Sequence, residues 1–200
     1  MSKLLATLLL CVLVTSYSFS QEPIFNNGFD LEFNMAITGD SYSLQRDYVG
    51  KDNGIITIGF QLGNHWYVYR NNKLGIAIDV NWLDFAYGRK SRETSNLNFI
   101  EVALVEVGPL ATYALTNDIA IEGYWNIRPT FLSTFKSDEW DIDILTEPAS
   151  GFTNAIGLGV KLKKYYVGFE STFGSVKDRK RAIIRKLMLT QFRFIGGFKF

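Results

Sequence analysis

The feature that most constrains the fold of this chain is the alternation of apolar and polar residues. From Gly28 to Thr38 the odd positions carry large apolar side chains, and the even positions carry mostly polar or small ones. Neighbouring side chains of a β-strand point to opposite faces, so a period of two predicts a strand with one apolar face. The pattern returns in seven further segments, at about 54–69, 73–88, 96–115, 118–132, 152–163, 165–174 and 186–200. The sequence therefore predicts an all-β protein, and 15% aromatic residues with 17 glycines fit that class.

The segment 96–115 breaks the alternation once. Large apolar residues occupy even positions up to Leu104 and odd positions from Val105 onwards. Glu101 and Glu106 nevertheless both need the polar face. A β-bulge adds one residue to a strand and shifts its phase, so we expect a bulge near Leu104–Val105.

Tight turns and longer connections alternate along the chain. The tight turns are Asn71-Asn72, Thr116-Asn117 and Lys163-Lys164, and the longer connections lie at about 39–53, 89–95, 133–151 and 175–185. Transmembrane β-barrels have short turns on one side of the membrane and longer loops on the other. The sorting of the connections therefore predicts an eight-stranded antiparallel up-and-down transmembrane β-barrel.

The polar faces of the predicted strands are suited to the inside of such a barrel. They carry charged residues at mid-strand beside glycine and alanine, namely Glu32, Asp79, Glu101, Glu106, Glu122, Arg128, Lys161, Glu170 and Arg193. Side chains alone fill the interior of an eight-stranded barrel, so small and charged residues can pair across it. The bulky apolar faces would then contact lipid, because they exceed the apolar patch that a soluble protein tolerates.

Aromatic residues gather towards both ends of the predicted strands. Trp66, Tyr67, Tyr69, Tyr113, Tyr165 and Tyr166 approach the tight turns, and Phe85, Tyr87, Phe99, Phe131 and Phe173 lie near the longer connections. Aromatic girdles at both interfaces are typical of membrane barrels. We interpret the two groups as such girdles.

The first twenty residues have the composition of an export signal. Lys3 precedes an apolar run from Leu4 to Val14, and Ser18-Phe19-Ser20 offers small residues for cleavage before Gln21. The run is shorter than the ~20 apolar residues that span a bilayer. Cys11 follows Leu10 rather than a small residue, which disfavours a lipoprotein. We expect a cleaved signal peptide at 1–20 and one barrel domain at 21–200.

The last predicted strand reads QFRFIGGFKF, with Phe192, Phe194, Phe198 and Phe200 on one face. In its topology, alternation and final strand the chain resembles the small eight-stranded outer-membrane β-barrel family, the OmpA/OmpX-like and porin-like group of Gram-negative bacteria. The resemblance implies an outer-membrane location, contact with lipid and lipopolysaccharide, and recognition of the strand ending at Phe200 by the barrel-assembly machinery. Deleting Phe200 is then expected to lower assembly yield more than stability.

The sequence gives little support for an enzyme, a cofactor or a metal site. His65 is the only histidine, and the serines lie mainly in the connections at the opposite end, so no acyl-transfer triad can be assembled from the spacing. We predict that His65 is a hydrogen-bonded lumenal or rim residue. The acidic stretch 137–143 lacks the spacing, glycine and terminal glutamate of a calcium loop. We expect no catalytic, cofactor-binding or metal-binding residues.

The basic residues of the last connection are Lys177, Arg179, Lys180, Arg181, Arg185 and Lys186. They have no stacking platform for bases, so no nucleic-acid partner is expected. They suit binding to lipopolysaccharide phosphates, or pairing with the acidic stretch.

The sequence favours a monomeric, non-enzymatic envelope barrel with a structural or surface-interaction role, or a very narrow pore. The alternatives are a lipid-modifying barrel enzyme and a secreted lipocalin-like ligand-binding barrel.

Overall fold

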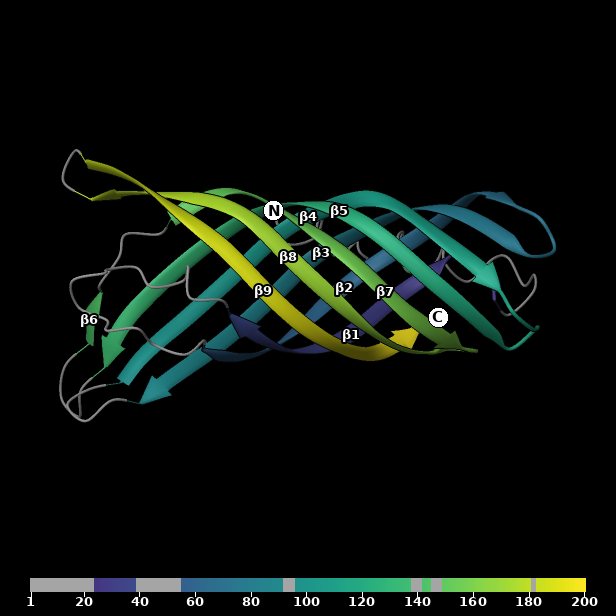
Figure 1. Ribbon diagram of the computed structural model, residues 1–200, viewed down its shortest axis with the longest axis horizontal. Helices are drawn as coiled ribbons and strands as arrows, with labels where there is room; N and C mark the ends of the chain where they lie inside the picture. The colour runs from purple at the N-terminus through teal and green to yellow at the C-terminus, as the bar shows by residue number, and fades with distance from the viewer. Residues whose placement is uncertain (1–23, 39–54, 92–95, 138–141, 145–148, 181–182) are drawn as a thin grey trace, which may run out of the picture.

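The computed structural model describes residues 24–38, 55–91, 96–137, 142–144, 149–180 and 183–200. These residues form long, strongly tilted strands that wind around one axis (Figure 1). The strands are β1 (Gly28–Thr38), β2 (Ile56–Arg70), β3 (Leu74–Ser91), β4 (Asn96–Ala114), β5 (Ile119–Ser137), β6 (Ile142–Ile144), β7 (Ala149–Leu162), β8 (Tyr165–Lys180) and β9 (Ile183–Lys199). Among the described residues, no helix has the length and apolar character to cross a membrane.

Eight of these strands close into a barrel, as predicted. The sheet runs in the order β4-β3-β2-β1-β9-β8-β7-β5, and a further pairing of β4 with β5 joins its two ends. All neighbouring strands are antiparallel. The sequence did not predict the three-residue strand β6, which pairs with the end of β5 at Phe135–Ser137.

The two faces of the strands have the predicted orientation. On β1, Phe33 is 56% exposed on the outside, whereas the neighbouring Glu32 is 6% exposed in the lumen. The same contrast holds on β7, where Leu158 lies outside and Lys161 inside. Bulky apolar residues therefore cover the outer surface, and polar, charged and small residues fill the lumen. A soluble barrel would have the opposite arrangement.

The predicted bulge on β4 is confirmed. Ala103 pairs with Thr130 of β5, and the next pair is Val107 with Ile127, so β4 holds one residue more than its partner over this stretch. Val105 takes the extra position with φ 55°. As a result Glu101 and Glu106 both point into the lumen.

A second bulge, on β3, was not predicted. Leu83 pairs with Leu62 of β2, and the next β3 residue in that ladder is Asn81, which pairs with Gly63. The extra residue is Trp82, and in the ladder between β3 and β4 both Trp82 and Val105 are passed over. The two bulges therefore face each other across one pair of strands. Trp82 lies outside while Asp84 turns into the lumen.

Three of the four long connections are shorter than predicted, and the first, between β1 and β2, is slightly longer. The clearest case is the predicted connection 175–185, which is wrong, because β8 continues to Lys180 and β9 begins at Ile183. Backbone pairing holds this hairpin together, from Ser175↔Met188 to Lys180↔Ile183. Backbone hydrogen bonds need no apolar face, so polarity alone did not reveal where the strands end. The predicted signal peptide, Cys11, Arg181 and residues 138–141 of the acidic stretch lie outside the described residues.

Candidate functional site

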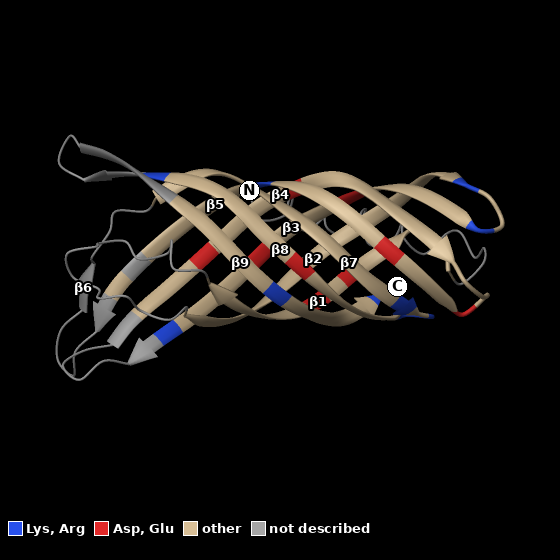
Figure 2. Cartoon of the chain, viewed as in Figure 1, with Lys and Arg blue, Asp and Glu red and all other residues tan. Residues whose placement is uncertain are grey.

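Charged residues are spread along the strands of the barrel (Figure 2), and many of their side chains are buried in the lumen. The described buried carboxylates are Asp30, Glu32, Asp79, Asp84, Glu101, Glu106, Glu122 and Glu170, and the described buried bases are Arg128, Lys161, Arg193 and Lys199, with His65 beside them. Charges removed from water are costly unless other charges and hydrogen bonds surround them. Two clusters supply most of those partners, one in the middle of the barrel and one towards the short-turn end.

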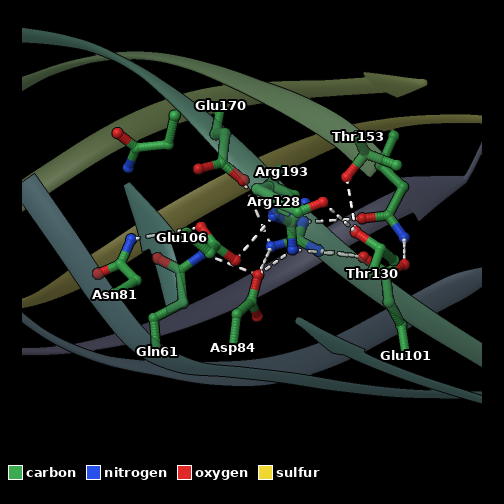
Figure 3. A network of polar contacts seen from close by, with 12 residues as sticks. Gln61, Asn81, Asp84, Glu101, Glu106, Arg128, Thr130, Thr153, Glu170 and Arg193 are labelled. Atoms are coloured by element: carbon green, nitrogen blue, oxygen red, sulfur yellow. Dashed lines mark hydrogen bonds and ion pairs between the residues drawn. The ribbon is translucent and has the colours of Figure 1, made fainter. Parts of the chain in front are cut away.

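The central cluster is built around two fully buried arginines, Arg128 of β5 and Arg193 of β9 (Figure 3). Arg128 bonds to Asp84, to Glu106 through Nε at 2.7 Å and to Glu101 at 3.3 Å. Arg193 bonds to the same Asp84 oxygen at 2.5 Å and to Glu101 at 3.0 Å. A planar guanidinium can bind several carboxylates at once, so both arginines share partners from β3 and β4.

Amides and a further carboxylate complete the central cluster. Gln61 Nε2 donates to Asp84 at 3.2 Å, and Gln191 Nε2 donates to Glu101 at 2.6 Å. Glu170 of β8 lies 3.3 Å from Arg193 Nη1 and accepts a hydrogen bond from the Tyr124 hydroxyl at 2.8 Å. The cluster thus ties β2, β3, β4, β5, β8 and β9 together across the lumen.

A second cluster, centred on Lys199 of β9, lies towards the short-turn end. The Lys199 ammonium is 3.0 Å from Glu122 and 3.4 Å from Glu32, and it lies 4.3 Å from the centre of the Tyr166 ring. Glu122 accepts from Thr112 at 3.3 Å, and the Thr112 hydroxyl is 2.7 Å from that of Tyr67. This chain of contacts joins the first and last strands of the barrel to β4 and β5.

His65 is a buried lumenal residue, as predicted. Its Nδ1 is 2.8 Å from Asp30, and its Nε2 is 2.6 Å from the backbone carbonyl oxygen of Asn26. Both ring nitrogens are therefore engaged by oxygen atoms of neighbouring residues. A general base needs a free lone pair directed at a nucleophile, and this geometry directs neither nitrogen at a serine.

The residues that the sequence placed in the lumen are found there, but others were missed. Asp84 was missed because the β3 bulge reverses the faces of the strand beyond Trp82. The sequence does contain a signal of this bulge. Asp79 and Asp84 are an odd number of residues apart, so both can face the lumen only if a bulge lies between them. Among the described residues, no group of three or more His, Cys, Asp or Glu is arranged to hold a metal ion.

The predicted aromatic girdles need a correction. Trp66, Tyr69, Tyr113 and Tyr165 lie outside, and Trp66 packs edge-on against Trp82 with ring centres 6.3 Å apart. Tyr166 and Phe99, in contrast, are fully buried in the lumen. Both residues lie near strand ends, as predicted, but their side chains point to the inner face of the strand.

No protein-family model matches the chain, and no curated protein sequence matches it significantly. Several solved bacterial surface structures are similar to it. Ail, the attachment invasion locus protein of Yersinia pestis, is 14% identical, with 87% of this chain and 97% of that one covered and a TM-score of 0.46. Neisserial surface protein A is 12% identical, with coverage of 86% and 96% and a TM-score of 0.49. OprG from Pseudomonas aeruginosa is 12% identical, with coverage of 87% and 96% and a TM-score of 0.38. The strand pairing of the chain itself shows the fold that the sequence predicted, a closed eight-stranded antiparallel β-barrel.

Proposed function

We propose that this chain is an integral outer-membrane protein with a non-enzymatic role, either structural or in interactions at the cell surface. The main observation behind this proposal is the distribution of polarity, which is the reverse of that in a soluble barrel. Bulky apolar residues lie outside and charged residues lie inside. In a bilayer the apolar exterior is solvated by lipid, and closure of the sheet satisfies the backbone groups that hydrocarbon cannot.

The central cluster supports a closed lumen over a conducting pore. Arg128 and Arg193 extend into the lumen from β5 and β9 and bond to carboxylates of β3 and β4. Eight strands leave an interior that side chains fill. The short-turn end faces the periplasm in this proposal, and the end that carries β6 faces outwards (Figure 1).

The membrane assignment is tested by fractionation of a Gram-negative host that expresses the full chain. A folded barrel is expected in the outer-membrane fraction, with faster gel mobility unheated than after boiling. A protein that stays soluble without detergent would contradict the proposal and support a lipocalin-like barrel.

The remaining enzyme alternative is tested at His65. His65→Ala is expected to leave the acylation pattern of lipid A unchanged relative to the parent chain, because both ring nitrogens are engaged by Asp30 and Asn26. A modification made by the parent chain and lost in His65→Ala would reassign the protein to the lipid-modifying enzymes.

A further inference from the structure

Residues 24–27, which precede β1, lie in the mouth of the barrel at the short-turn end. Ile24 and Phe25 are each 2% exposed and pack with Ala120 of β5. The Phe25 ring meets Tyr67 edge-on, with ring centres 5.6 Å apart. We call residues 24–27 the strap. Its two apolar side chains are inside the barrel, although no strand pairing holds them there.

Three successive backbone carbonyls of the strap accept hydrogen bonds from basic side chains of the barrel. Lys161 Nζ donates to Ile24 at 3.1 Å, Arg70 Nη1 donates to Phe25 at 3.1 Å, and His65 Nε2 lies 2.6 Å from the Asn26 carbonyl oxygen. Lys161 belongs to β7, whereas Arg70 and His65 belong to β2. In the strand order these two strands lie on opposite sides of the closed ring, so the strap crosses the mouth.

Two groups of the barrel depend on the strap for a partner. Lys161 is 1% exposed, and among the described residues the one acceptor bonded to its ammonium is the Ile24 carbonyl. A buried ammonium without an acceptor is strongly disfavoured. The pairing of β2 with β1 ends at His65, and two residues further the Tyr67 amide donates instead to the Asn27 side chain at 2.7 Å.

We propose that the short-turn mouth is a binding site for a short peptide, occupied by the strap of the same chain, and that the bound strap seals the lumen at this end. The three basic side chains recognise backbone carbonyls, and the apolar pocket takes two consecutive large apolar side chains. The ligand class is therefore a short peptide with an apolar pair. The strap makes its contacts outside the β-ladders, so it docks onto a finished barrel.

The sealing is measured with a cysteine placed beneath the strap. Ala120 is fully buried and contacts the strap, so Ala120→Cys in a Cys11→Ser background reports access to the mouth. The full chain is folded in detergent and treated with a water-soluble maleimide. Ile24→Asp with Phe25→Asp is expected to raise the labelling rate about tenfold or more, because two carboxylates are strongly disfavoured in a buried site. Leu115→Asp, at an exposed position of the same end, should leave the rate unchanged.

Lys161→Met provides a milder test, because it removes one donor and leaves the strap sequence intact. It is expected to raise labelling by a smaller factor than the double variant. Equal rates in the parent and both variants would overturn the sealing. Failure of the double variant to fold would overturn docking onto a finished barrel, and Lys161→Met would then decide the sealing alone.

The peptide site is tested by adding the strap back in trans. A synthetic peptide of residues 21–27 is supplied to the double variant at millimolar concentration, because a tethered segment has an effective concentration of about that order. It is expected to slow the labelling of Ala120→Cys. A peptide with aspartate at both apolar positions should have no effect. If neither peptide protects, the mouth is not a peptide site.

Discussion

Arg128 is the residue whose loss should disturb the lumen most. It contacts three carboxylates from two strands, Asp84, Glu101 and Glu106. Each of these was removed from water when the barrel closed, and each needs a positive partner there. Arg193 also binds Asp84 and Glu101, so the two arginines together hold charges that would repel one another without them.

Arg128→Met is expected to lower the free energy of unfolding by about 3–5 kcal/mol, the usual cost of removing one partner of a buried charge cluster. Denaturant unfolding of the folded barrel in detergent measures this. Lys163→Met is the matched control, since Lys163 is exposed and lies 3.9 Å from an exposed Asp118. An exposed pair contributes only about 0–1 kcal/mol. Equal effects of both changes would show that the central cluster contributes little stability.

Glycines set the shape of the lumen beside its tyrosines. A methyl group at Gly157 would lie 2.1 Å from the Tyr124 ring, and one at Gly159 would lie 2.5 Å from the Tyr166 ring. Both glycines belong to β7, and the rings come from β5 and β8. The sequence predicted that small residues line the lumen, but it gave no means of pairing each glycine with its ring. That pairing depends on register between strands that are distant in the chain.

At the level of the strand, the β4 bulge adds one residue and so exchanges the inner and outer faces of the strand beyond it. Deleting Val105 is expected to leave a regular strand in which Glu101 and Glu106 still face the lumen, and it also removes a β-branched residue from φ 55°. The deletion should therefore fold, as judged by heat-modifiable gel mobility. The β3 bulge opposite it would lose its partner, so the stability should fall without loss of the fold.

Deleting Ile121 from β5 is the control, because no register shift is found in the pairing of β5 with β7. A slip of one residue exchanges the two faces of a strand. The deletion therefore turns towards lipid either Glu122 and the lumenal residues that follow it, or the lumenal residues that precede Ile121. It is expected to abolish folding. If the Val105 deletion also failed to fold, the bulge would be required for more than phase.

The sequence was sufficient for the strands, their faces and one bulge, because each of these leaves a period that can be counted. It was insufficient for the second bulge at Trp82, because Trp82 and Leu83 are both large apolar residues and only Asp84 marks the change of face beyond them. It also failed for the strap, since Ile24 and Phe25 are too few to show a period. Their burial depends on donors that come from β2 and β7.

For the molecule as a whole, the outer surface separates a membrane barrel from a soluble one. Leu158→Arg, at a position of the outer face that is 62% exposed, is expected to destabilise the barrel in lipid vesicles by about 2–4 kcal/mol. Leu115→Arg, at a turn residue that is 54% exposed, should cost about 0–1 kcal/mol, as near an interface. Equilibrium unfolding in vesicles gives both values. Similar small effects would mean that Leu158 does not face hydrocarbon.

The Lys199 cluster has a consequence for how the barrel completes itself. Lys199 of the last strand meets Glu32 of the first, and Arg193 of the same strand reaches Asp84 of β3. If β9 met β1 one residue out of register, both bases would face hydrocarbon, and their carboxylates would be left alone in the lumen. A shifted register is therefore destabilised, and the correct register is stabilised by ion pairs at two separate levels along the barrel axis. The interior charges therefore favour the correct register of the closing strands over one shifted by a residue.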